Sequence, residues 1–345
     1  MSVQPPFPGG ALVISLDFEL HWGVRDKRTV VEDRERLLGG RAAVPALLEL
    51  FADAGIHATW AIVGLLLAET KREMLARLPP TVPYARAALS PYAVLIDVGD
   101  SERDDPFHFA PSLIRRIVAT PGQEIGTHTF SHYYCLEPGQ TQAHFRADVA
   151  AAIGITRDKL GLVPASIVFP RNQVSEPHVA VCAELGLRAY RGNPEGWAYR
   201  ARRDQDERLV RRGVRLVNAY LPIIRPRHGG GPAGGSLPVN VTASRYLRPY
   251  APGLRSLEPL REHRLATELT RAAHEQRIFH LWWHPDDFGL YVAENMAVVR
   301  RFLERFRALR ERTGTESLTM REAADRLATA HAPVADSAAA SSSSA

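Results

Sequence analysis

Short apolar runs alternate with longer stretches of helical periodicity from residue 11 onward. The runs predict strands over residues 11–20, 56–64, 124–130, 165–171, 188–192, 214–221 and 278–285. Predicted helices cover residues 42–55, 143–155, 177–187 and 256–276. A capping-box pattern at Thr319 and Glu322 begins a last helix. Apolar strands that alternate with helices favour a parallel sheet covered by helices.

Seven predicted strands in one alternating series fit a closed or nearly closed barrel better than two separate domains. An open doubly wound sheet is the alternative, but the chain after the first strand reads SLDFELHWG and lacks a glycine-rich phosphate turn. We expect an N-terminal extension over residues 1–10 and one barrel domain over 11–332. A Gly/Pro-rich insertion is expected near 225–238 and a disordered tail over 333–345.

Composition supports an ordinary globular protein. The chain has 345 residues, 45% of them hydrophobic, and a formal net charge of +5. These figures exclude collagen, a disulfide scaffold and disorder throughout. The two cysteines, Cys135 and Cys182, could pair, but they are too few to staple the fold, which favours a reducing compartment. The start MSVQPPFPGG has no signal-peptide pattern and no apolar run reaches about 18 residues, so we expect a cytoplasmic protein without membrane contact.

The sequence pI of about 9.4 raises the question of nucleic-acid binding. The basic residues are almost all arginine, and they are interleaved with Asp and Glu as on solvated helix faces. No recognition motif accompanies the charge, so we expect no nucleic-acid partner.

Two acidic residues stand at the end of the first predicted strand. Burying a carboxylate costs free energy unless something uses it, so Asp17 and Glu19 are candidate functional residues. Strand alternation places both on one face. The structural alternative is an ion pair with Arg25 or Arg28.

Two histidines follow the third predicted strand in the segment HTFSH. His128 and His132 could approach one another on one helical turn or from a tight loop, and two neutral imidazoles form half of a Zn-type site. Glu19 or Asp17 could complete a two-histidine, one-carboxylate set with open coordination positions. The alternative is a pair of surface histidines.

Two further side chains lie at strand ends. His284 ends the last predicted strand and is a candidate general acid, whereas His280 fits a core histidine. Arg171 ends the fourth and could orient a carboxylate through a bidentate pair, although a surface arginine is the alternative.

The order of these pieces resembles the five motifs of the polysaccharide deacetylase family (NodB homology, carbohydrate esterase family 4). The resemblance covers roughly residues 11–290 and is most specific at HTFSH, which matches His-[Ser/Thr]-x-x-His. It implies a distorted (β/α)7 TIM-like barrel with the site at the carboxyl ends of the strands.

Carried over by position, the resemblance implies functional roles for individual residues. Asp17 would be the catalytic base, held by Arg171, and His284 the general acid, while Trp197 would form a wall of the pocket. His128 and His132 would be metal ligands.

Two motifs depart from the family pattern. The family has two adjacent aspartates in its first motif, but here Phe18 separates Asp17 from Glu19, which would be the third ligand. No Asp pair flanks Trp197, so Asp286 or Asp287 could orient His284 instead.

The implied reaction is hydrolysis of a non-peptide amide, with an N-acetyl sugar or a related small molecule or oligosaccharide as substrate. The expected cofactor is a divalent metal, Zn first, with Co, Mn or Ni as alternatives. A backbone N–H near Tyr133 would stabilise the oxyanion, and Trp22 would stack on a sugar ring. The competing hypotheses are a metal-free amide hydrolase of the same superfamily and a non-catalytic carbohydrate-binding protein.

Overall fold

The computed structural model describes residues 5–221 and 237–330. The strands are β1 (Ala11–Phe18), β2 (Ala58–Ile62), β3 (Gln123–Thr127), β4 (Ser166–Ile167), β5 (Ala189–Tyr190), β6 (Val239–Asn240), β7 (Arg245–Tyr246), β8 (Ile278–Trp283) and β9 (Glu316–Leu318). The helices are α1 (Val30–Ala54), α2 (Lys71–Ala76), α3 (Pro111–Ala119), α4 (Gln142–Leu160), α5 (Glu176–Glu184), α6 (Leu209–Tyr220), α7 (Glu258–His274), α8 (Val292–Thr313) and α9 (Met320–Ala330).

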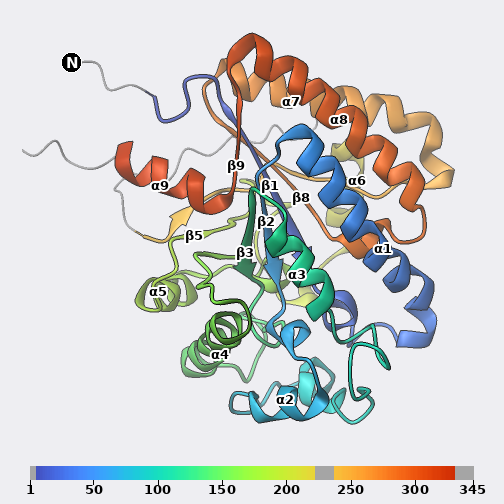
Figure 1. Ribbon diagram of the computed structural model, residues 1–345, viewed down its shortest axis with the longest axis vertical. Helices are drawn as coiled ribbons and strands as arrows, with labels where there is room; N and C mark the ends of the chain where they lie inside the picture. The colour runs from blue at the N-terminus through green and yellow to red at the C-terminus, as the bar shows by residue number, and fades with distance from the viewer. Residues whose placement is uncertain (1–4, 222–236, 331–345) are drawn as a thin grey trace, which may run out of the picture.

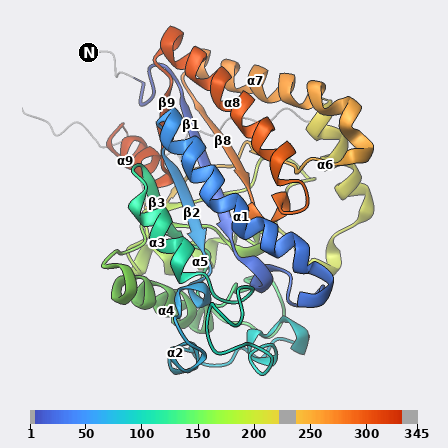
Figure 2. The same cartoon turned by 45° about the vertical axis from the view of Figure 1, so that its right-hand side comes forward.

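The strands form a parallel half-barrel in the order β6-β5-β4-β3-β2-β1-β8-β7. β1 is central: it pairs with β8 on one edge, and on the other with β9 at its beginning and β2 at its end. Figures 1 and 2 show α1 and α8 side by side in front of these strands. The predicted barrel of parallel strands covered by helices is therefore confirmed as a fold class.

Strand alternation separates an outer core from the inside of the half-barrel. Leu12, Leu16 and Phe18 of β1 belong to the large apolar cluster beneath the covering helices. Val13 faces inward, where it joins a smaller cluster with residues of α9. Because α9 contacts β1, β5 and β6, its apolar side chains fill the inside of the half-barrel.

The inward column continues along β1 with polar side chains. Ser15 accepts a hydrogen bond from Arg191 over 3.0 Å and lies 2.8 Å from Nε2 of His280. Burial lowers the pKa of His280 to about 3, so this histidine is a neutral core residue, as its sequence position suggested. Asp17 follows one step further along the same face, at the carboxyl end of β1.

One predicted strand is wrong, and three strands of the described residues are missing from the sequence analysis. Residues 214–221 fall mostly in α6, an amphipathic helix that begins at Leu209, rather than in a strand. The short apolar run fits either periodicity when it is considered alone. The unpredicted strands β6, β7 and β9 have only two or three residues each.

Other expectations meet the structure in different ways. The capping box at Thr319 is confirmed, because Glu322 Oε2 accepts the Thr319 N–H over 2.8 Å. Cys135 and Cys182 are both buried and free, so the disulfide considered above does not form. Most of the 225–238 segment and the tail from 333 lie outside the described residues. Within the described ranges no helix has the length and apolar character to cross a bilayer.

Candidate active site at the carboxyl ends of the strands

The loop after β3 is shaped so that its two histidines point to one place. Thr129 and His132 have positive φ angles of 64° and 56°, a left-handed backbone that costs a non-glycine residue roughly 1–2 kcal/mol. Asp148 of α4 stabilises the turn, because its Oδ1 accepts the N–H groups of Phe130 and Ser131 over 2.7 and 3.3 Å. The histidines therefore converge from a tight loop, one of the two possibilities left open by their spacing.

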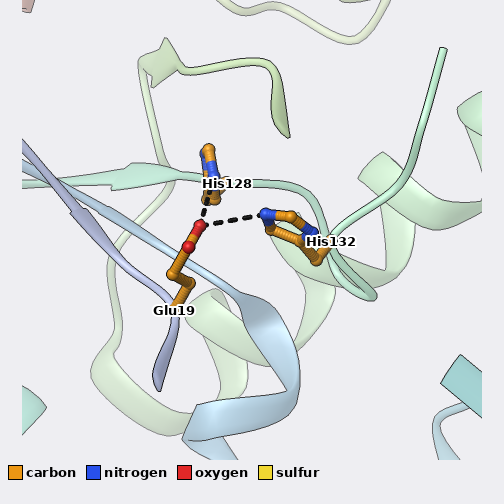
Figure 3. Close-up of side chains that lie close together, drawn as sticks. All are labelled: Glu19, His128 and His132. Atoms are coloured by element: carbon orange, nitrogen blue, oxygen red, sulfur yellow. Dashed lines mark hydrogen bonds and ion pairs between the residues drawn. The ribbon is translucent and has the colours of Figure 1, made fainter. Parts of the chain in front are cut away.

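Glu19 meets both imidazoles from the end of β1. Its Oε2 lies 3.1 Å from Nε2 of His128 and 2.9 Å from Nε2 of His132, as Figure 3 shows. One ligand atom from each of the three residues lies within 4.8 Å of the others. All three side chains are at most 9% exposed. The proposed pairing of Glu19 with Arg25 or Arg28 does not occur: Arg25 bonds to the carbonyls of Trp22 and Leu89 and Arg28 to Asp33.

The hydrogen bonding of His128 fits a cation at this point. Its Nδ1 lies 2.8 Å from the carbonyl oxygen of Val168, which can only accept, so Nδ1 carries the proton. Its Nε2 faces the Glu19 carboxylate and is the nitrogen that would ligate a cation shared with that carboxylate. Burial lowers the pKa of His132 to about 3, so the His132 ring is neutral. The donor set is the two-histidine, one-carboxylate arrangement of open divalent sites.

A glycine makes room for the Glu19 side chain. A Cβ placed on Gly23 would lie 1.8 Å from Oε1 and 2.1 Å from Cδ of Glu19. The close approach leaves the carboxylate fixed between this backbone and the imidazoles.

Asp17 is held by Arg191 at the end of β5. The guanidinium donates from Nη1 to Oδ1 over 2.7 Å and from Nη2 to Oδ2 over 2.6 Å. Burial alone would raise the pKa of Asp17, but the charge of Arg191, with smaller contributions from His128 and His284, holds it below its ordinary value. Asp17 is therefore an ionised carboxylate in a fixed orientation.

The expectation that Arg171 holds Asp17 is wrong. Arg171 donates to Asp26, lies 3.6 Å from Asp204, and places its guanidinium 4.3 Å from the ring centre of Tyr134. Arg171 follows a strand end just as Arg191 does. Sequence position alone therefore could not decide which of the two arginines bonds to Asp17.

His284 completes the group. Its Nε2 lies 3.6 Å from Asp17 and 3.8 Å from Glu19, and its Nδ1 bonds to Oδ2 of Asp287 over 2.8 Å. Of the two aspartates considered for this role, Asp287 is therefore the one that orients the ring. Burial disfavours the charged imidazole, but the carboxylates of Glu19, Asp287 and Asp17 outweigh it and raise the pKa of His284 well above its ordinary value.

The expected aromatic and oxyanion contacts need correction. Trp22 is fully buried and donates from its indole nitrogen to the carbonyl of His108, so it is a core residue. The Tyr133 N–H already donates to Oγ1 of Thr129 over 2.7 Å, so it is committed to the loop rather than open to an oxyanion. Trp197 is 51% exposed. It does not line the cavity that is bounded by Asn172, Tyr246 and Trp282. Trp282 lines that cavity and lies 4.1 Å beneath the Arg191 guanidinium.

Sequence reasoning missed Arg191 and Asp148 as parts of the site. Alternation places Trp282 on the inward face of β8 with Ile278 and His280. Asp148 left no such signal, since it lies on a helix that the sequence does not place against the loop.

The fold and the site thus define a half-barrel scaffold with a buried Glu/His/His cluster beside an Asp–Arg pair and a histidine. The family model described as polysaccharide deacetylase matches residues 33–190. The match confirms the resemblance over this part of the chain. No curated protein matches the sequence.

Several solved structures are similar to this chain, and one of them supports the same fold. A Mycobacterium smegmatis protein assigned to the polysaccharide deacetylases is similar at 15% identity with a TM-score of 0.58, covering 95% of this chain and 96% of its own. A carbohydrate esterase family 4 pseudoenzyme from Bacillus anthracis has 9% identity, a TM-score of 0.43 and coverages of 94% and 70%. A family 4 carbohydrate esterase from Streptomyces lividans, in complex with acetate, has 10% identity, a TM-score of 0.38 and coverages of 87% and 88%.

Proposed function

We propose that this protein is a metal-dependent hydrolase that removes the acyl group, most simply acetyl, from the nitrogen of an N-acyl sugar. The observation that carries the proposal is the convergence of Glu19, His128 and His132 with Asp17 and His284 at one end of the half-barrel. A single cation position and two proton-transfer groups lie within one small volume.

The metal would be held by Glu19, His128 and His132, and Zn is the first candidate because imidazole and carboxylate ligands suit it. A divalent ion in this position supplies a Lewis acid for the acyl carbonyl and lowers the pKa of a water molecule.

The protein's own groups perform the proton transfers. Asp17 Oδ2 accepts a proton from the attacking water while Arg191 keeps the carboxylate in place. His284 Nε2 donates a proton to the departing nitrogen, and Asp287 fixes the ring through Nδ1. Water adds to the acyl carbon, the C–N bond breaks, and the products are a carboxylic acid and an amine. An amine leaves poorly as its anion, which is why the acid is needed.

The test combines metal content with acetate release. The purified parent is expected to retain about one divalent ion per chain and to release acetate from an N-acetyl sugar panel. His132→Ala should lose both the ion and the activity. His274→Ala, an exposed histidine at the end of α7, is the matched control and should retain both.

Two outcomes would contradict the proposal. Acetate release that survives both a chelator and His132→Ala would favour the metal-free amide hydrolase. Sugar binding that survives Asp17→Asn, in a parent that releases no acetate, would favour the non-catalytic carbohydrate-binding protein.

A further inference from the structure

A cavity of about 550 Å³ adjoins the proposed reaction site. Three of its lining residues contact the groups described above. Asn172 Oδ1 accepts from Arg191 over 3.0 Å, Trp282 lies beneath the same guanidinium, and Tyr246 donates to the Asp287 carboxylate. A molecule in this cavity therefore lies next to the residues that orient Asp17 and His284.

Among the residues that the structure describes, the rest of the cavity wall is strongly basic, and Glu207 is its single carboxylate. Seven described arginines line it: Arg171, Arg200, Arg202, Arg212, Arg215, Arg245 and Arg248. Three of these arginines form ion pairs with protein carboxylates: Arg171 with Asp26, Arg215 with Glu207 and Arg245 with Glu268. We call this space the arginine cavity.

The other four arginines have no ion pair with a carboxylate in the described part of the chain. Arg200, Arg202 and Arg212 are exposed, whereas Arg248 is half-buried. Burial, together with the positive charge of Arg215, lowers the pKa of Arg248 from its ordinary value. Like charges gathered in a partly desolvated space repel one another, and a bound anion would offset that repulsion.

We propose that the arginine cavity binds a phosphoryl group of the substrate, so that the substrate class is a phosphorylated N-acyl sugar. This inference rests on the proposed function, since it names the substrate of the same site. Guanidinium groups bind phosphate oxygens bidentately, and several of them match a dianion with three free oxygens better than a carboxylate with two. The cavity volume is within the range of small-molecule pockets.

The charge of the cavity is tested first without catalysis. Calorimetric titration with glucosamine 1-phosphate, which has no amide to hydrolyse, should show binding to the parent. Arg212→Gln and Arg248→Gln should each weaken that binding about tenfold to a hundredfold, the range for a hydrogen bond to a charged group. Arg307→Gln on α8, exposed and outside the cavity, is the matched control and should bind as the parent does. Because Arg212 is also exposed, its replacement leaves packing intact.

Kinetics then identifies the anion. The parent should hydrolyse N-acetylglucosamine 1-phosphate with a kcat/KM at least about tenfold above that for the uncharged methyl glycoside of N-acetylglucosamine. Arg212→Gln should remove that preference through KM, whereas the control Arg307→Gln should keep it. Comparison with UDP-N-acetylglucosamine distinguishes a phosphate monoester from a diphosphate, and a preference for either supports the proposal.

The failure of this inference can be told apart from the failure of the proposed function. If glucosamine 1-phosphate binds through Arg212 and Arg248 but no N-acetyl sugar is hydrolysed, the anion site stands and the proposed reaction falls. Equal turnover of charged and neutral sugars, unchanged in both variants, overturns the phosphoryl site and leaves the hydrolase. A stronger preference for an N-acetylated uronic acid also overturns it, by assigning the cavity to a carboxylate.

Discussion

Replacing Arg191 with methionine tests the assignment of Asp17 most directly. The substitution removes both hydrogen bonds to Asp17, of 2.7 and 2.6 Å, from a pair whose side chains are 0% and 3% exposed. Removing one partner of a buried ion pair leaves an uncompensated charge and costs about 3–5 kcal/mol of folding free energy. Because the base is no longer held, kcat should fall by about a hundredfold or more.

The assay measures three quantities on the same Arg191→Met preparation: the free energy of unfolding in urea, kcat for acyl release, and bound metal per chain. Metal content should stay at the parent level, because the guanidinium contacts Asp17 and not the Glu19 cluster. Arg191→Lys keeps the charge but loses the two-pronged geometry, so its kcat should lie between those of the parent and Arg191→Met.

The matched control is Arg41→Met. Arg41 pairs with Glu102 over 2.5 Å and donates to the backbone carbonyls of Pro106 and Phe109. None of these contacts involves Asp17 or Arg191. It should lower stability and leave kcat within about threefold of the parent, since the altered interaction is a partly exposed ion pair. A folded Arg191→Met protein whose kcat equals that of the parent would refute the role given to Asp17.

Three other outcomes follow from the geometry. Gly23→Ala should displace the Glu19 carboxylate, whose Oε1 would lie 1.8 Å from the new Cβ, and metal content measured after dialysis should fall while the protein stays folded. Asp287→Asn should lower kcat about tenfold to a hundredfold, because Asp287 orients His284. Metal content should stay normal, since Asp287 does not contact the proposed metal ligands, and loss of metal from this variant would contradict the role given to Asp287. Burial raises the pKa of Asp148 to about 6, so its contribution to stability is greatest below pH 4 and is lost as pH rises through about 6. Urea unfolding from pH 4 to 7 should therefore show the parent losing roughly 3 kcal/mol relative to Asp148→Asn across that range, and parallel curves would contradict the prediction.

Much of the fold was predictable because the signal for it is local. Val13, Ser15 and Asp17 share one face of β1 and alternate with apolar residues that face the helices. An alternation with a period of two residues indicates a strand from the sequence alone. Residues 214–221 were misassigned for the same reason: a short apolar run was considered without the amphipathic helix that begins before it. The two-residue strands β4 and β5 were found because they lie within the longer predicted runs 165–171 and 188–192, whereas no predicted run contains β6, β7 or β9.

The site was predictable where its residues stand next to one another in the chain and unpredictable where they meet across the half-barrel. The two histidines of HTFSH and the Asp17–Glu19 pair each lie within five residues of the chain. Arg191 and Arg171 each follow a short strand, and only the distances to Asp17 and Asp26 assign their partners.

By itself, the sequence determined a parallel strand-and-helix architecture and the side chains available for cation binding and proton transfer. Tertiary structure decided which arginine holds Asp17, which aspartate orients His284, and that seven arginines of the described residues share one cavity beside them. The physical reason is that periodicity and residue type depend on nearest neighbours along the chain. Ion pairing and burial depend on distances of a few ångströms between segments that only the folded backbone brings together.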